Sequence, residues 1–256
     1  MSREVVRFQL SGKYGHFRKP YSNVSALSYP IPPRTALVGL IGAILGIEKD
    51  EAPVLLGKGR MDVAVQTATP VTTVTHIAIF RQSGPGEVNT KKILGKREAK
   101  RQVKLKKPPD FSTPALIPME ILREPSYLVD VALQDLSLMD DLIFRLKHGR
   151  AVYTPCLGLS EFLAEIEYIS EGTATAQEAG SHKVATVVPV DGGTLSLNDL
   201  DEISQLHVQE IRLPYLGTPD RRFTYRKYLV NFEPKPIPVT TTVPPFLYGD
   251  QSIMFM

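Results

Sequence analysis

The feature that most constrains the fold is the stretch from Tyr29 to Gly46, YPIPPRTALVGLIGAILG. Its prolines keep the chain extended, because proline fixes the backbone and is tolerated at a helix start but not inside a helix. From Arg34 onwards, apolar residues recur at helical spacing. The stretch therefore predicts a proline-rich loop that leads into a buried helix over about 34–46.

Glycines interrupt the apolar side of this predicted helix at Gly39, Gly42 and Gly46. A glycine inside a helix costs roughly 1 kcal/mol relative to alanine, so Gly39 and Gly42 need a packing reason. The run lacks both GxGxxG and GK[ST], so it is not a nucleotide-binding fingerprint. We expect close packing of this helix on a sheet, and a left-handed helix end at Gly46.

Composition narrows the class of protein. The chain has 256 residues, of which 43% are apolar, enough for one large or two modest domains with a real core. The single cysteine, Cys156, excludes an internal disulfide, and we interpret it as a small buried residue rather than a nucleophile. There is no signal-peptide pattern and no membrane-length apolar run, which predicts a cytoplasmic protein. The histidines lack metal-ligand spacing, so neither a metal nor another cofactor is expected.

Charge is concentrated in one segment. Residues 91–107 contain nine Lys or Arg and a single acid, Glu98, giving this segment a formal charge of +8 and the remainder −5. A localised basic arm on a mildly acidic body is typical of a protein that binds a polyanion. A solvated loop, or an arm that docks on an acidic protein surface, would give the same pattern.

Periodicity predicts the other elements. Alternating or β-branched residues predict strands over Glu4–Leu10, Met61–Thr69, Val71–Gln82, Ala115–Leu133 and Glu161–Ile169. A second long helix is predicted over Ser137–His148 with Ser137 as its cap, and a short one over Asp50–Leu56. We expect 11–28 to form a long surface loop and 170–183 a polar linker.

The order strand, helix, strand, long hairpin, strand, helix, strand is that of the split βαβ arrangement. The sequence therefore predicts an α+β protein with a ferredoxin-like domain over 1–170, an arrangement that RNA-recognition (RRM) folds also use. A long basic β-hairpin is expected at about 83–113. A small β-rich C-terminal domain or extension follows over 183–256.

Two stretches carry a family resemblance. The pairing of SYPIPPRTALVGLIGAILG with YTPCLGLSEFLAEI, with a basic insertion between two strands, resembles the Cas-five family of CRISPR-associated RAMP proteins. The resemblance covers the chain to about Ile169, and an I-B-like organisation of a type I complex (Cascade) fits it. It implies a ribonucleoprotein subunit for antiviral defence that binds and caps the 5′ handle of CRISPR RNA. Its implied partners are the backbone subunit (Cas-seven) and the large subunit, with target DNA near the PAM as a further candidate.

The resemblance places the thumb on 83–113, a glycine-rich loop on 155–160 around Gly158, and the proline-rich segment on 28–34. The first loop adds the cations and aromatic rings that suit phosphate contacts and base stacking. The predicted RNA-binding residues are Tyr14, His16, Arg18, Lys19, Ser28, Tyr29, Arg34, Lys91, Lys92, Lys96, Arg97, Lys100, Arg101, Lys104, Lys106, Lys107, Arg150, Gly158 and Ser160. A similar mixture at 221–228 is also explained by a strand with one aromatic face.

Some relatives in the family cut precursor RNA, which requires a group that deprotonates the 2′-hydroxyl and another that stabilises charge. Lys147 and His148, with Tyr29 or Tyr153, are the candidates for such a site. The same Lys147 and His148 also suit a helix C-terminus. We expect a binding subunit rather than an enzyme. A metal-independent endoribonuclease, or a protein-docking scaffold with a basic arm, remain the alternatives.

Overall fold

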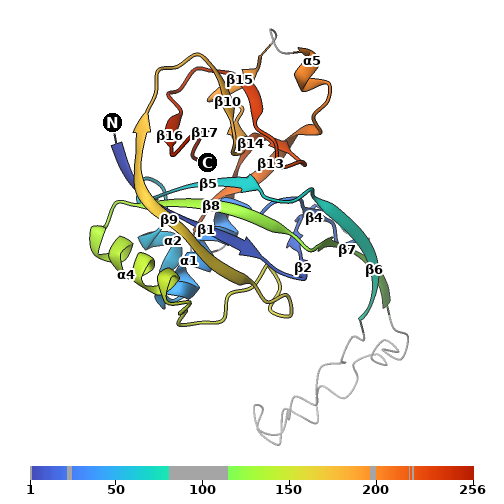
Figure 1. Cartoon of the computed structure of the whole chain (residues 1–256). Coiled ribbons are helices and arrows are strands. Elements are labelled where there is room, and N and C mark those ends of the chain that lie inside the picture. The colour runs from blue at the N-terminus through green and yellow to red at the C-terminus, as the bar shows by residue number, and fades with distance from the viewer. Residues whose placement is uncertain (1, 22–24, 81–114, 197–199, 219, 221) are drawn as a thin grey trace, which may run out of the picture.

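The computed structural model describes residues 2–21, 25–80, 115–196, 200–218, 220 and 222–256 (Figure 1). The predicted thumb at 83–113, with its basic residues 91–107, lies outside these ranges. Within them, a nine-stranded sheet has the order β12-β15-β10-β17-β16-β9-β1-β8-β5, and smaller sheets flank it. The protein is α+β, with far more strand than helix.

Four long strands from the N-terminal part form one end of the large sheet. They are β1 (Ser2–Ser11), β5 (Met61–Thr67), β8 (Ser126–Leu133) and β9 (Glu165–Ala176). Strand β1 lies between β8 and β9 and is antiparallel to both, and β5 is antiparallel to β8. Helices α1 (Arg34–Leu45), α2 (Ala52–Leu55) and α4 (Leu136–Lys147) lie together on one side of these strands (Figure 1).

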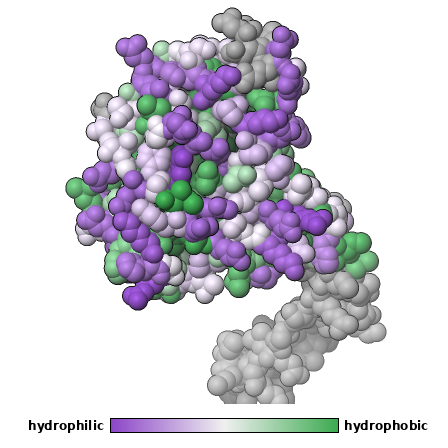
Figure 2. Space-filling view, in the orientation of Figure 1, coloured by the Kyte–Doolittle hydropathy of each residue, from purple (hydrophilic) through white to green (hydrophobic). Residues whose placement is uncertain are grey.

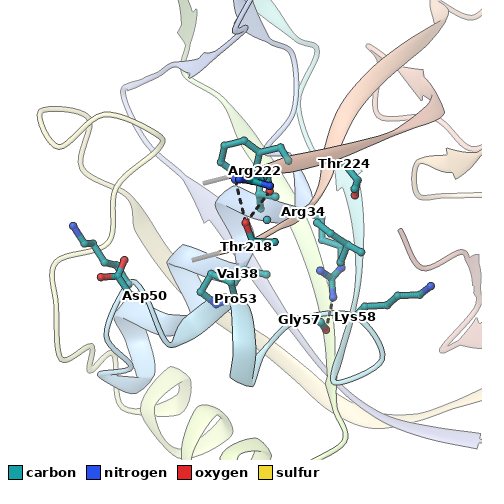
Figure 3. Close-up of a pocket in the computed structure, with 14 residues that line it drawn as sticks. Arg34, Val38, Asp50, Pro53, Gly57, Lys58, Thr218, Arg222 and Thr224 are labelled. Carbon is teal, nitrogen blue, oxygen red and sulfur yellow. Dashed lines mark hydrogen bonds between the residues drawn. The ribbon is translucent and has the colours of Figure 1, made fainter. Parts of the chain in front are cut away.

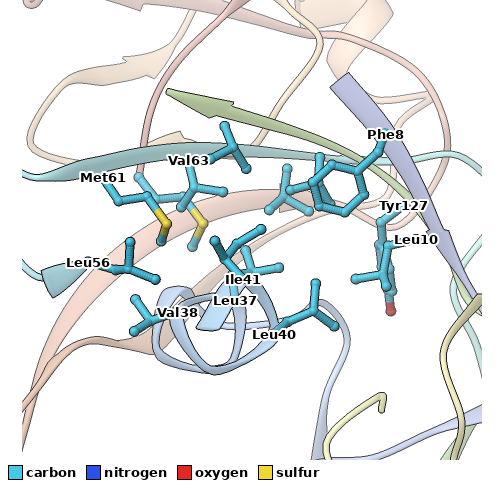
Figure 4. Packing of buried hydrophobic residues seen from close by; sticks show 14 of the residues in the cluster. Phe8, Leu10, Leu37, Val38, Leu40, Ile41, Leu56, Met61, Val63 and Tyr127 are labelled. Carbon is cyan, nitrogen blue, oxygen red and sulfur yellow. The ribbon is translucent and has the colours of Figure 1, made fainter. Parts of the chain in front are cut away.

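The main core lies between these strands and the helices. Alternate residues of each strand point to one face, so Phe8 and Leu10 of β1 and Val63 of β5 are buried on the helix side. Leu37 and Ile41 of α1 are fully buried against them (Figure 4). This packing fixes α1 against the sheet, and with it both ends of the helix.

The predicted first helix is confirmed, but the reason for its glycines is only partly as expected. Gly46 has φ +80° and its amide donates to the Gly42 carbonyl, which ends the helix in the left-handed conformation. A β-carbon on Gly42 would meet Ala52 of α2 at 3.1 Å, so this glycine admits a neighbouring helix, not a sheet. Gly39 is exposed and a β-carbon there would meet nothing within 4 Å, so close packing does not explain it.

The long strand predicted over 115–133 is wrong as one element. It divides into β7 (Ala115–Arg123) and β8 where Glu124 takes φ +47° before Pro125. Strand β7 is not part of the large sheet. It pairs with β6 (Thr72–Phe80) and β2 (Tyr14–Gly15) in a separate three-stranded sheet. The β6–β7 hairpin projects from the body (Figure 1), and its last described pair is Phe80 with Ala115.

Other boundaries differ from those predicted. The segment after β1 is not a surface loop, because it forms β2, β3 (Phe17–Arg18) and β4 (Ser28–Tyr29) and buries His16 and Phe17. The predicted polar linker at 170–183 is also wrong, because β9 continues through it to Ala176 and β10 (Ser181–Val184) follows. Helix α4 is capped by the Asp135 carboxylate rather than by Ser137, whose own amide donates to that carboxylate at 3.0 Å.

The C-terminal part is β-rich. Its remaining elements are β11 (Val188–Pro189), β12 (Gly193–Leu195), α5 (Leu200–Ile203), β13 (Val208–Gly217), β14 (Phe223–Asn231), β15 (Ile237–Thr241), β16 (Phe246–Tyr248) and β17 (Gln251–Ile253). Strand β16 pairs with β9, so these strands continue the large sheet. Strands β11, β14 and β13 form a separate sheet, and β13 packs on α1.

Candidate nucleic-acid interface

A groove separates α1 from the loop at 155–160, and both motifs that carry the family resemblance line it. We call this cavity of about 320 Å³ the α1 groove. Its helix wall combines the small residues Ala36, Gly39 and Ala43 with Leu37 and Leu40, and its other wall includes Cys156 and Gly158. The missing side chain at Gly39 therefore leaves the groove open, which gives this exposed glycine a structural role.

The loop at 155–160 packs tightly against the segment that follows β1. Gly158 has φ +92°, and a β-carbon there would lie 1.9 Å from the carbonyl oxygen of His16. The amide of His16 donates to the carbonyl of the fully buried Leu157 at 2.9 Å. Internal packing alone thus requires glycine at position 158, whether or not a phosphate approaches.

A hydrogen-bond network connects this segment to the base of the β6–β7 hairpin. His16 Nδ1 lies 2.7 Å from the carbonyl oxygen of Glu120 on β7, and the amide of Ser28 donates to the Glu120 carboxylate at 2.8 Å. The Ser28 hydroxyl in turn accepts from the amide of Phe17 at 3.0 Å. His16 and Ser28 therefore orient the hairpin relative to the groove.

The predicted RNA-binding residues fall into two groups by burial. Within the described ranges, Arg18, Arg150, Gly158 and Ser160 are exposed, Tyr14 keeps 38% of its surface and Lys19 is half-buried. His16, Ser28, Tyr29 and Arg34 are buried and face protein groups instead. The predicted lysines and arginines at 91–107 lie outside the described residues. On the face shown in Figure 2, hydrophilic and hydrophobic residues interleave.

The candidates for RNA cleavage each have separate partners. Lys147 Nζ pairs with Glu171 at 2.8 Å, and this hydrogen bond raises the pKa of the lysine. The His148 ring packs against the Phe144 ring at a tilt of 36° with centroids 4.3 Å apart, and its Nδ1 lies 2.7 Å from the Phe144 carbonyl oxygen.

Tyr29 is completely buried, and burial raises its pKa well above the ordinary value. The Tyr153 hydroxyl donates to Glu48 at 2.9 Å. The structure thus places Tyr29 in the core while Lys147 and His148 are exposed at the end of α4.

A second cavity, of about 360 Å³, lies between the start of α1 and the β13–β14 turn (Figure 3). Arg34, Lys49, Lys58 and Arg222 line it. Sequence reasoning singled out Arg34 and the 221–228 stretch separately, but not Lys49 or Lys58. Isolated lysines give no local pattern, so only the fold could bring them together.

Two features of the described ranges bear on the class of site. No three His, Cys, Asp or Glu side chains in these ranges lie close enough to hold a metal ion. Every helix in the same ranges is too short or too polar to cross a bilayer.

Comparison with known proteins places the chain in one family. The profile of the family described as CRISPR-associated protein (Cas_Cas5) matches residues 5–229, most of the chain. A search of curated proteins gives no match.

Two solved structures share the fold. One is a chain of a structure described as a CRISPR RNA-guided surveillance complex, with 15% sequence identity, 91% of each chain covered and a TM-score of 0.52. The other is a CRISPR protein from Archaeoglobus fulgidus, with 14% identity, 99% of this chain and 98% of that chain covered, and a TM-score of 0.50. At this identity the likeness concerns the fold alone.

Proposed function

Since the chain belongs to the Cas-five family of CRISPR-associated proteins, we propose that it is a non-catalytic subunit of a type I interference complex (Cascade) that grips the 5′ handle of CRISPR RNA. The membership gives the chain a role in CRISPR interference. The proposal adds the ligand, the type of complex and the absence of catalysis. Its proposed partners are the CRISPR RNA, the backbone subunit (Cas-seven) and the large subunit, with target DNA near the PAM as a further contact. The proposed complex has an I-B-like organisation.

One observation carries the proposal. The nine basic residues of 91–107 lie in sequence between Phe80 and Ala115, the paired ends of a hairpin that projects from the body. A positively charged segment that connects the two strands of such a hairpin in sequence suits contact with phosphates, which position a strand without reading its bases.

The α1 groove supplies the second half of the proposed RNA site. Its apolar walls can shield an unstacked base, and Arg18, Arg150 and Ser160 offer exposed polar contacts on neighbouring segments. The buried residues His16 and Ser28 have a supporting role, because they tie this surface to β7, which leads to the thumb. Tyr29 and Arg34 likewise support the site from within the core.

The proposal includes the architecture. We assign residues 1–170 to a ferredoxin-like domain with a thumb at 83–113, and residues 183–256 to a β-rich extension. The strand order β9-β1-β8-β5, with α1 and α4 on one side, supports this assignment because it is the order that a split βαβ unit requires.

Binding is favoured over RNA cleavage by the contacts of the candidate catalytic groups. Lys147 is paired with Glu171, the His148 ring packs at a tilt against Phe144, and Tyr29 is buried in the core. Incubation of the purified protein with labelled repeat RNA and EDTA should leave the RNA intact. Discrete cleavage that disappears in His148→Ala would overturn the non-catalytic assignment.

The handle itself is tested by comparing two RNAs that share a spacer sequence, one with the repeat-derived 5′ handle and one without it. We expect the protein to bind the first at least tenfold more tightly, and RNA that copurifies with the protein to begin with repeat sequence. Equal affinity for the two RNAs would contradict capping of the 5′ end.

A further inference from the structure

The cavity between α1 and the β13–β14 turn has the size of a small-ligand site. Its volume of about 360 Å³ lies within the roughly 300–1,000 Å³ typical of such pockets. We call it the Arg34 pocket. Its walls come from three parts of the chain: the start of α1, the 49–58 segment, and residues 216–218 with 222–224 at the facing ends of β13 and β14 (Figure 3).

The pocket carries an excess of positive charge. Arg34 is only 2% exposed, yet its guanidinium donates to backbone carbonyls, those of Gly57 at 2.9 Å and Met61 at 2.7 Å, and forms no ion pair among the described residues. Asp62, a carboxylate whose charge acts on Arg34, is itself paired with Arg3. A buried cation without a counter-charge is unfavourable, so an anion in the adjacent cavity would be stabilising.

The rim of the pocket adds to this charge. Lys49, Lys58 and Arg222 line it, and within the described ranges none of the three forms an ion pair, whereas Asp50 is the one carboxylate in the lining. The ligand expected here is therefore anionic, and more than one cation can reach it.

The remaining wall is apolar and partly aromatic. Val38, Pro53 and Leu216 line it, together with Phe223, whose side chain keeps 47% of its surface exposed. An exposed aromatic ring beside cations is the combination on which an unpaired base stacks while its phosphate is neutralised. The hydroxyls of Thr35 and Thr224 provide polar groups for a base edge or a ribose.

We propose that the Arg34 pocket binds one nucleoside monophosphate unit, with the base against Phe223 and the phosphate between Lys58 and Arg222, where the buried charge of Arg34 stabilises it through space. A free nucleotide and one unit of an RNA strand share this chemistry. The identification of the ligand as a unit of an RNA strand rests on the proposed function. The affinity of the pocket for a mononucleotide does not depend on that function.

The first experiment titrates the full chain with AMP, UMP and inorganic phosphate by calorimetry at low salt. We expect saturable binding of the mononucleotides, tighter than phosphate by about tenfold because of stacking. Phe223→Ala should remove that tenfold preference, and Lys58→Ala with Arg222→Ala should abolish binding. Arg60→Ala and Phe144→Ala are the matched controls, because both residues are exposed and neither lines the pocket.

The second experiment crosslinks 4-thiouridine-substituted CRISPR RNA to the chain and maps the attached peptide. If crosslinks form at 222–224 and free AMP prevents them, the ligand of the pocket is a unit of an RNA strand. If mononucleotides bind but no such crosslinks form, the ligand is a free nucleotide. If neither mononucleotide binding nor crosslinking is found, or if phosphate binds as tightly as AMP, the proposed nucleotide site is wrong. Handle RNA that still binds in that case leaves the proposed function standing.

Discussion

The carbonyl oxygen of His16 occupies the space beside Gly158 so fully that an ideal β-carbon on Gly158 would lie 1.9 Å from it. Gly158→Ala should therefore lower the free energy of unfolding through both this clash and the positive φ, by about 3 kcal/mol or more. Urea denaturation measures this change.

Gly149→Ala separates the two contributions, because Gly149 also has positive φ, +58°, but a β-carbon there meets nothing within 4 Å. It should lose only about 1 kcal/mol. Equal losses in the two variants would show that the loop moves away from His16.

Two buried tyrosines should respond differently to loss of the hydroxyl. Tyr127 donates to the Pro30 carbonyl at 2.7 Å, so Tyr127→Phe should cost about 1 kcal/mol or more. The Tyr29 hydroxyl is buried with no hydrogen-bond partner among the described residues, so Tyr29→Phe should be neutral or stabilising. Thermal unfolding of both variants tests the contrast, and a large loss in Tyr29→Phe would indicate a partner for that hydroxyl.

The same tyrosines predict a loss of stability in alkali. Burial raises the pKa of Tyr29 and of Tyr127 above their ordinary value of about 10. Above that pH the unfolded chain releases phenolic protons that the folded chain retains, so the free energy of unfolding falls as pH rises. Denaturant titrations at pH 8 and pH 10.5 should show this fall, and it should be smaller when both tyrosines are changed to phenylalanine.

On the face of the large sheet opposite the helices, Arg7 and Asp130 form a bidentate ion pair, with Nε to Oδ1 at 2.7 Å and Nη2 to Oδ2 at 3.0 Å. Asp130 is completely buried, so Arg7→Met should cost about 3–5 kcal/mol by leaving its carboxylate unpaired. Arg7→Met combined with Asp130→Leu should recover much of this loss.

The control pair is Arg3 with Asp62, whose side chains are 34% and 29% exposed. Arg3→Met should cost no more than about 1 kcal/mol. A comparable loss in Arg3→Met would contradict the role of burial.

RNA affinity should depend steeply on salt. Binding of a single strand releases counterions in proportion to the phosphates neutralised, so the logarithm of the association constant should fall linearly with that of the salt concentration. Alanine at the nine basic positions of 91–107 should flatten this slope, and arginine at the same lysines should keep it. A slope that alanine leaves unchanged would favour the scaffold alternative.

Local pattern was sufficient to predict the elements that bury an apolar face. The apolar spacing from Arg34 predicted α1, and Gly46 ends it as expected. Alternation predicted β1 and β5, because one face of each packs on the helices. The cap of α4 was misplaced by two residues, since Asp135 and Ser137 are both good capping residues and only the geometry distinguishes them.

Contacts between distant segments could not be predicted in this way. The short strands β2, β3 and β4 have too few residues for a period, and they exist because β7 and the 155–160 loop pair and pack with them. The continuation of β9 through 170–176 was missed because its residues are polar and alternate little. The Arg34 pocket assembles cations that lie far apart in the sequence.

Strand β16 meets β9 through two residue pairs, Phe246 with Ala176 and Leu247 with Thr175. Near this pairing, Arg7 of β1 also donates to Gln251 of β17 at 2.9 Å and lies over the Tyr248 ring at 4.8 Å. Backbone hydrogen bonds add to these contacts, because the amides of Val187 and Met256 donate to the carbonyls of Val65 and Val63, both at 2.8 Å. A protease that nicked the backbone between Gln177 and Gly180 would therefore leave two fragments held together by backbone and side-chain contacts, which would separate only in denaturant.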